Sequence, residues 1–155
     1  MQDSKPFYRL IYTSRATAPI DTKQILAQAR KNNAERGITG GLALLEGTFI
    51  QYLEGSEGTV NDVFSHILRD ARHRDVKVLE RRAVPQRMFG DWSMTFLDWT
   101  VRTKLIFRSF SPGLQLDLYE TDPMTAAPLF RAFLPQICWL FVWSAVSVCT
   151  TTEIN

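Results

Sequence analysis

The clearest pattern in this chain is an apolar stripe at helical spacing that begins at residue 60. Six apolar residues recur there at intervals of three and four: Val60, Val63, Phe64, Ile67, Leu68 and Ala71. This spacing places them on one face of an amphipathic helix, whose N-terminal cap is predicted at Thr59 with Asp62. Such a helix is stable only when its apolar face packs against another element. The chain must therefore fold into packed layers.

The segments around this helix have the composition of β-strands. Runs rich in β-branched and aromatic residues predict five strands, at residues 7–13, 38–46, 48–54, 76–84 and 92–99. A second helix is expected to begin at Thr22, after an N-cap at Asp21, and to end at Gly37. Glu46-Gly47 is expected to form the turn of a hairpin. The order β-α-β-β-α-β-β predicts a ferredoxin-like α+β fold, with a mixed five-stranded sheet and two helices on one face.

The last third of the chain differs in composition from the rest. Charged residues are sparse after residue 102, and none occurs between Ala132 and Thr152. We expect residues 1–102 to form one domain and residues 103–155 to form a helical C-terminal extension, which packs on the open face of the sheet or in an oligomer. The charge-free stretch is long enough for a membrane span. A proline and several polar residues interrupt it, however, and no Lys/Arg cluster flanks it, so we do not expect a membrane location.

The composition excludes several classes of function. The chain has 155 residues, of which 45% are hydrophobic and 22% charged, as in an average folded domain. Its formal net charge of +2 gives no indication of nucleic-acid binding. Cys138 and Cys149 are too few for a disulfide framework, and the first residues lack the apolar segment of a secretory signal. A cytoplasmic location is therefore expected.

The usual catalytic signatures are missing from the sequence. No GxSxG, HExxH, CxxC, GKS or GKT motif occurs. His66 and His73 are seven residues apart, but the arginines beside them disfavour a cation, so no metal site is expected. Residues 66–87 carry an excess of positive charge, which suits a phosphate or pyrophosphate ligand and equally a solvated polar face.

Several polar side chains stand at positions that the predicted fold brings together beside the two helices. Tyr12 lies on a strand, Gln51 lies between two apolar residues on a strand face directed at the core, and Asn32 or Asn33 completes the apolar stripe of the first helix. A phenol and two amides are not nucleophiles or bases near neutral pH, but they can hydrogen-bond the edge of a planar heterocycle. Taken singly, each residue also has a purely structural interpretation. Tyr12 could be a phenol at the rim of the core, Gln51 a hydrogen-bonded core amide, and the asparagines the C-cap of the first helix. Their coincidence in one fold favours binding.

Five short segments resemble, in order and spacing, those of BLUF domains, which are blue-light sensors that use a flavin. The segments are YRLIYTS at 8–14, RKNNAERGITGGL at 30–42, FIQYLEG at 49–55, RDARH at 69–73 and FGDWSM at 89–94. The resemblance covers about residues 6–100. It implies the split βαβ sheet predicted above, with the ring of FAD, or of FMN, held noncovalently between the two helices. It also implies a photoreceptor and not an enzyme.

The resemblance implies a role for each of the polar residues. Tyr12 matches the tyrosine that donates an electron and a proton in the photochemistry, and Gln51 matches the glutamine between this tyrosine and the flavin N5 and O4 atoms. Asn33 matches the residue that bonds the O4/N3 edge of the flavin, and Asn32 is expected at or near the ring. Gln51 is suited to act as a switch, because rotation or tautomerisation exchanges which end of its amide faces Tyr12.

Further positions match the parts of the family's site that hold the flavin. Ile25 and Ile67 match the aliphatic residues on either side of the ring. Asp70, Arg72 and His73 match the end of the site that meets the pyrimidine edge and the ribityl-phosphate side of the cofactor.

Trp92 and Met94 match the pair on the fifth strand whose exchange near the glutamine is argued to carry the signal. Strand alternation places these two residues and Phe96 on the same face of the sheet. The chain departs from the family at two positions. His66 stands where some members have Arg, and Ala29 stands where some have Ser, which puts one polar contact to the ring in doubt.

Other functions stay open at this point. No cyclase, phosphodiesterase or DNA-binding segment is evident, so a photosensor of this kind is expected to signal to an effector protein on a separate chain and to form a homo-oligomer. A small acylphosphatase-type enzyme shares the fold class, although Arg15-Ala16-Thr17 is a poor match for its glycine-rich loop. An RNA-binding sheet is disfavoured because its aromatic signature is missing. A flavin-binding module without photochemistry is a further alternative.

Overall fold

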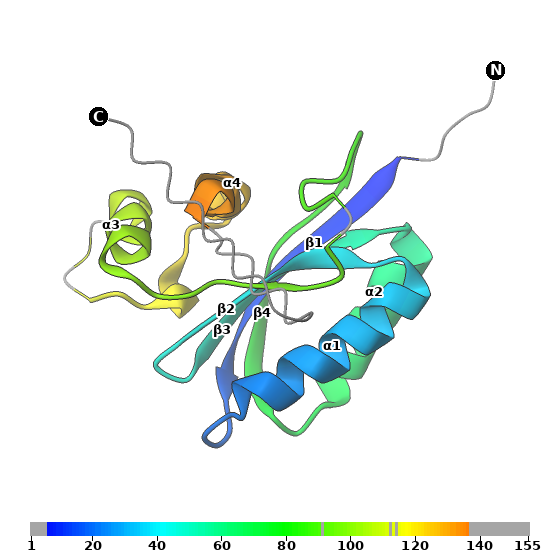
Figure 1. The fold of residues 1–155 in the computed structure, drawn as a ribbon, viewed down its shortest axis with the longest axis horizontal. Helices are drawn as coiled ribbons and strands as arrows, with labels where there is room; N and C mark the ends of the chain where they lie inside the picture. The colour runs from blue at the N-terminus through cyan, green and yellow to red at the C-terminus, as the bar shows by residue number, and fades with distance from the viewer. Residues whose placement is uncertain (1–5, 91, 112, 114, 137–155) are drawn as a thin grey trace, which may run out of the picture.

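The computed structural model describes residues 6–90, 92–111, 113 and 115–136. These residues form one five-stranded sheet with helices on both faces (Figure 1). The strands are β1 (Phe7–Ala16), β2 (Thr39–Leu45), β3 (Thr48–Gly55), β4 (His73–Val84) and β5 (Thr95–Phe96), in the order β4-β1-β3-β2-β5. Neighbouring strands are antiparallel except β2 and β5, which run parallel. The sheet is therefore mixed, as predicted.

The helices divide between the two faces of this sheet. One face carries α1 (Thr22–Arg36) and α2 (Glu57–Arg69), whereas α3 (Val101–Phe110) and α4 (Ala126–Phe133) lie on the other (Figure 1). Three short 3₁₀ turns flank α4: η1 (Leu118–Glu120), η2 (Pro123–Thr125) and η3 (Leu134–Gln136). The predicted α+β architecture, with a C-terminal helical extension opposite the two helices, is confirmed.

The ends of α1 follow from local sequence signals. The Asp21 side chain accepts hydrogen bonds from the backbone N–H groups of Lys23 and Gln24, at 3.1 and 3.3 Å, and so satisfies two donors of the first turn. Gly37 closes the helix with a φ of 66°, in the left-handed region that glycine adopts without a steric cost. Both predicted caps are confirmed.

Several predicted boundaries are wrong. The first strand continues to Ala16 and does not end at residue 13, and the fourth begins at His73 and not at residue 76. The second helix begins at Glu57 after an N-cap at Ser56, and not at Thr59, whose hydroxyl accepts a hydrogen bond from the Ser56 hydroxyl at 2.7 Å. The strand predicted at residues 92–99 is only two residues long. Side chains of α1 take the carbonyls just before it: Asn33 Nδ2 donates to Ser93 O at 3.2 Å, and Arg30 Nε donates to Met94 O at 3.1 Å.

Alternate residues of the central strands supply two apolar clusters, one on each face. Leu10 and Leu53 pack with α1 and α2, whereas Ile11 and Ile50 pack with residues of α3 and α4. The extension thus buries the face that the first hundred residues would leave open. Most of the charge-free stretch 132–152 lies outside the described residues. Within the part of the chain that the structure describes, no helix is long and apolar enough to span a membrane.

Candidate functional site

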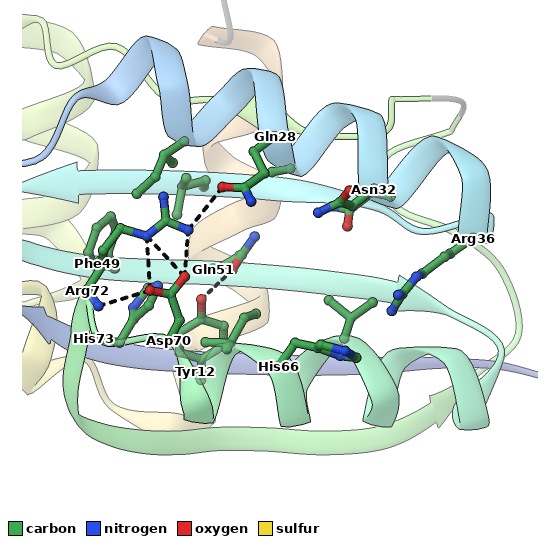
Figure 2. A pocket seen from close by; sticks show the side chains of 16 residues that line it. Tyr12, Gln28, Asn32, Arg36, Phe49, Gln51, His66, Asp70, Arg72 and His73 are labelled. Atoms are coloured by element: carbon green, nitrogen blue, oxygen red, sulfur yellow. Dashed lines mark hydrogen bonds and ion pairs between the residues drawn. The ribbon is translucent and has the colours of Figure 1, made fainter.

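A cavity of about 240 Å³ lies between α1 and α2, above the strands β1 and β3. Figure 2 shows side chains from both helices and from the sheet converging on it. The eight positions that sequence motifs suggested for cofactor binding all line it: Ile25, Asn32, Asn33, Gln51, Ile67, Asp70, Arg72 and His73. The structure therefore gathers, at one cavity, residues that are spread over nearly fifty positions of the sequence.

Tyr12 and Gln51 form a hydrogen-bonded pair at the floor of this cavity (Figure 2). They are direct partners in the register of β1 and β3, and the Tyr12 hydroxyl donates to Gln51 Oε1. Tyr12 is fully buried, and this burial raises the pKa of its phenol far above the ordinary value, with a smaller contribution from the negative charge of Asp70. The phenol is therefore neutral at physiological pH and available as a donor.

The other end of the Gln51 amide meets Met94. Gln51 Nε2 lies 3.6 Å from Met94 Sδ, in the geometry of a weak hydrogen bond to sulfur. Trp92 does not share this side of the sheet: it packs with the cluster on the extension side, whereas Met94 and Phe96 pack with the helices α1 and α2. The expectation that Trp92 shares one face of the sheet with Met94 and Phe96 is thus wrong, because residues 92–94 precede the short strand β5 and do not follow its pleat.

The two asparagines at the end of α1 differ in their surroundings. Asn33 is buried, and its Nδ2 donates to Ser93 O, which links the helix to the segment that carries Met94. Asn32 is exposed to the cavity, where its amide is open to a ligand (Figure 2). The stripe predicted on α1 therefore combines one anchoring amide with one available amide.

One end of the cavity is lined by an ion pair. Arg72 Nη2 and Asp70 Oδ2 are 2.6 Å apart, and Arg72 Nη2 also donates to Gln28 Oε1 on α1 at 3.1 Å (Figure 2). Hydrogen bonds from Arg72 hold the pKa of Asp70 below its ordinary value. Next to this pair, His73 Nδ1 lies 2.8 Å from Ser14 Oγ, and burial lowers the pKa of His73. His73 is therefore neutral near pH 7.

Three further polar residues line the cavity, and of these the resemblance had indicated only His66. Gln28, Arg36 and His66 also face the cavity, the last two from opposite helices at the end away from Arg72 (Figure 2). The helical repeat could have indicated Gln28 and Arg36, since they lie three and eleven residues after Ile25.

The structure offers no support for a metal centre or for a phosphatase-like loop. The described part of the chain contains no group of three or more His, Cys, Asp or Glu side chains arranged to hold a metal ion. Arg15, which an acylphosphatase-type loop would direct at a substrate, instead donates to Thr48 Oγ1 at 2.8 Å and pairs with Asp117 at 3.1 Å.

Comparison with protein families decides between the remaining interpretations. The family model for BLUF, described as sensors of blue-light using FAD, matches residues 7–95. The chain belongs to the BLUF family. A BLUF domain is a sensor module and is not itself catalytic.

Known BLUF proteins are similar to this chain in sequence and in fold. The chain is 34% identical over 90 residues to the photoactivated adenylate cyclase subunit beta of Euglena gracilis, which covers 56% of this chain and 10% of that protein. The BLUF protein BlrB, in its dark state, is 28% identical with a TM-score of 0.66, covering 83% of this chain and 94% of BlrB. BlsA in its ground state shares the fold, with 24% identity, a TM-score of 0.73, and coverage of 92% of this chain and 93% of BlsA.

These matches differ in how much of each protein they include. The chain spans about a tenth of the length of the curated cyclase subunit that it matches. Its fold, in contrast, is shared with BlsA over 92% of the chain, beyond the residues that match the BLUF family model. The described part of the extension, which ends at residue 136, is therefore part of the architecture that these two chains have in common.

BLUF domains bind FAD, and the cavity between α1 and α2 suits a flavin. Ile25 on α1 and Ile67 on α2 give it apolar walls on the two sides where a flat ring needs them. Gln51 and Asn32 supply amide donors and acceptors for the polar edge of such a ring. The hydrogen-bonding groups beside these walls are therefore neutral amides, which suit a neutral planar heterocycle. The charged side chains lie at the ends of the cavity.

Proposed function

We propose that the protein is a blue-light receptor that binds FAD noncovalently in the cavity between α1 and α2. One observation carries this proposal: Tyr12, Gln51 and Met94 form a buried series of hydrogen bonds that starts at the floor of the cavity and ends at Met94, immediately before β5. Bound flavin supplies absorption of blue light and, when excited, an electron acceptor. Tyr12, Gln51 and Met94 are proposed to convert the excitation of the flavin into a change of hydrogen bonding.

Tyr12 and Gln51 are proposed to be the light-responsive pair. Tyr12 has a single O–H, which it donates to Gln51 Oε1, so any loss of the phenolic electron and proton removes the bond that orients the glutamine. Without this hydrogen bond, no interaction with Tyr12 favours the orientation in which Gln51 Oε1 faces it. Rotation of the amide can then place the donor end of Gln51 where the acceptor end was. A change of one such hydrogen bond is worth about 1 kcal/mol, which is enough to bias a contact with two alternative arrangements.

The remaining lining residues are proposed to hold the flavin. Ile25 and Ile67 flank the ring, and Asn32 and Asn33 lie at its polar edge. Asp70, Arg72 and His73 lie at the end toward the pyrimidine edge and the ribityl phosphate, where the cation of Arg72 suits a negatively charged group. Residues 1–102 form the photosensor in this proposal, and residues 103–155 form its output extension.

The output is proposed to leave through Met94, Trp92 and the extension. Met94 contacts Gln51 on one side of the sheet, and Trp92 packs with the extension on the other, so the segment between them connects both clusters. An effector protein on a separate chain, or a second copy of this chain in a homo-oligomer, would then receive the signal in the cytoplasm.

The test compares three forms of the purified protein in the dark and under blue light. Protein loaded with flavin should stay yellow after desalting, and chromatography of the released flavin identifies FAD or FMN. Light should shift the flavin absorption bands reversibly to longer wavelength. Tyr12→Phe and Gln51→Leu should retain flavin and lose the shift, because they remove the phenolic proton and the amide with little change in volume.

Two outcomes would contradict the proposal. If the protein retains no flavin, it has no group that absorbs blue light in this cavity and is not the proposed photoreceptor. A normal red shift in either variant would leave a flavin-binding protein whose photochemistry does not use the Tyr12–Gln51 pair.

A further inference from the structure

A second cavity, of about 270 Å³, lies on the face of the sheet that the extension covers. It is lined by residues of β1, β3, the end of β4 and the turn after it, α4 and the start of η3. No residue that lines it also lines the cavity between α1 and α2. It is thus a separate feature, placed where the sheet meets the extension.

Guanidinium groups from three elements line this second cavity: Arg9 on β1, Arg87 in the turn after β4, and Arg131 on α4. Arg9 pairs with Glu80 at 2.7 Å, but its Nε is buried and has no hydrogen-bond partner among the described residues. Because this Nε atom has no accessible surface, a ligand in the cavity does not reach it. Arg9 therefore contributes its positive charge beside the cavity, and the carboxylate of Glu80, which is shared with Arg82, offsets only part of that charge.

The other two cations, unlike Arg9, have no carboxylate partner among the described residues. Arg87 donates to neutral oxygens, namely Thr39 Oγ1 and Gly37 O at 2.8 Å and Glu54 O at 3.3 Å. Arg131 is exposed and forms no ion pair with any residue that the structure describes. The cavity therefore has more positive charge than its neighbours compensate.

The nearby acids do not remove this excess. The buried Glu54 carboxylate accepts hydrogen bonds from Thr39 and from the backbone N–H groups of Met88 and Phe89, all at 2.7 to 2.8 Å. Glu80 is shared between Arg9 and a further arginine, Arg82, at 3.7 Å. Neither carboxylate is available to Arg131.

We propose that this second cavity binds the phosphate group of a small organic ligand. A phosphate carries more than one negative charge near neutral pH and accepts hydrogen bonds in several directions, which suits guanidinium groups that approach from three elements. A carboxylate, in contrast, is planar and is satisfied by one guanidinium. The Tyr52 ring and the aliphatic side chains of Val84 and Leu134 give the cavity apolar walls for the organic part of the ligand.

Titration calorimetry on the full-length, flavin-loaded protein in the dark tests this site, because the flavin then blocks the cations of the first cavity. The probes are inorganic phosphate and phenyl phosphate, with acetate as the carboxylate, all at constant ionic strength. We expect saturable binding at one site, tighter for phenyl phosphate than for phosphate. Arg131→Gln should weaken binding about tenfold or more, as the loss of a charge-assisted hydrogen bond does.

Arg108→Gln is the matched control, because Arg108 is also exposed, lies on α3 and does not line the second cavity. Its binding should equal that of the wild type within twofold. The proposal is overturned if no saturable binding occurs, if Arg131→Gln binds like the wild type, or if both variants weaken binding equally. It is also overturned if acetate binds as tightly as phosphate.

Discussion

At the scale of single residues, Gln51 is a buried side chain whose two ends meet partners of unequal strength. Its Oε1 accepts from the phenol of Tyr12, whereas its Nε2 meets the thioether of Met94 at 3.6 Å. A thioether is a weak acceptor, so the amide N–H loses little when it turns away. The orientation of Gln51 therefore depends mainly on Tyr12 and on what occupies the cavity, which is the property that a light-driven switch requires.

The residues of this site could be predicted where a regular period applies. Gln51 and Tyr12 face the helices because side chains alternate along β1 and β3, and Ile67 faces the cavity because it continues a helical stripe. Trp92 could not be placed in this way. It precedes β5, and its position depends on hydrogen bonds from α1, which no local pattern indicates.

The titration of His73 should make the protein less stable in mild acid. Burial lowers its pKa below the ordinary 6.5, against the opposing effect of Asp70 and with a further lowering by Arg72. As the pH falls through about 6.5, the unfolded chain takes up a proton at this residue, whereas the folded protein does so only at lower pH. The contribution of His73 to stability is therefore complete above pH 6.5 and is lost progressively below it.

Urea unfolding at pH 7.5 and at pH 5.5 measures this loss. The decrease in the free energy of unfolding should be smaller in His73→Gln than in the wild type, because the variant has no group to titrate at this position. Arg108→Gln, which changes an exposed group far from His73 in the sequence, should behave as the wild type does. Equal decreases in all three proteins would show that His73 does not contribute.

At the scale of elements, those with local end signals could be predicted from the sequence and those held by distant contacts could not. The caps at Asp21 and Gly37 set the limits of α1 from residues that lie within one turn of its ends. The two-residue length of β5, in contrast, depends on Asn33 and Arg30, whose side chains donate to the carbonyls of Ser93 and Met94, 60 and 64 residues away in the sequence. The length of a strand that is limited by such distant contacts cannot be predicted from the residues of the strand itself.

The hairpin between β2 and β3 should be sensitive to its turn. Glu46 and Gly47 have φ values of 49° and 74°, the left-handed conformation of the tight turns that suit a hairpin. Gly47→Ala places a Cβ in this conformation and should lower the free energy of unfolding by about 1 kcal/mol. Gly58→Ala, in the first turn of α2 where a Cβ meets no atom within 4 Å, should instead raise it by up to about 1 kcal/mol.

Denaturant unfolding of both alanine variants distinguishes the two effects. They remove the same glycine freedom from the unfolded chain, so a difference in sign isolates the strain at the turn. If Gly47→Ala is as stable as Gly58→Ala, the turn does not need its left-handed glycine.

At the scale of the whole molecule, one strand connects the candidate flavin site with the extension. Gln51 faces the helices α1 and α2, and the next residue, Tyr52, faces the opposite cluster. The Tyr52 ring is 4.9 Å from Phe89 and 5.4 Å from Phe130 on α4, in edge-to-face contacts. A shift of β3 at Gln51 would therefore reach α4 through a single intervening residue. The partner that detects such a shift could not be predicted, because the fold of a domain does not determine which protein it binds.

Hydrogen exchange on the intact, flavin-loaded protein should detect this connection. If the signal leaves through the extension, blue light should change the protection of residues 94–96 and of α4, because Met94 contacts Gln51 and Phe130 on α4 contacts Tyr52. Gln51→Leu should abolish the difference between light and dark while keeping the flavin. Sedimentation in both states should show whether the oligomer changes with it. Identical exchange in light and dark across residues 92–136, with an unchanged oligomer, would rule out this route, since a population shift without any change in protection or assembly could not be read by a partner.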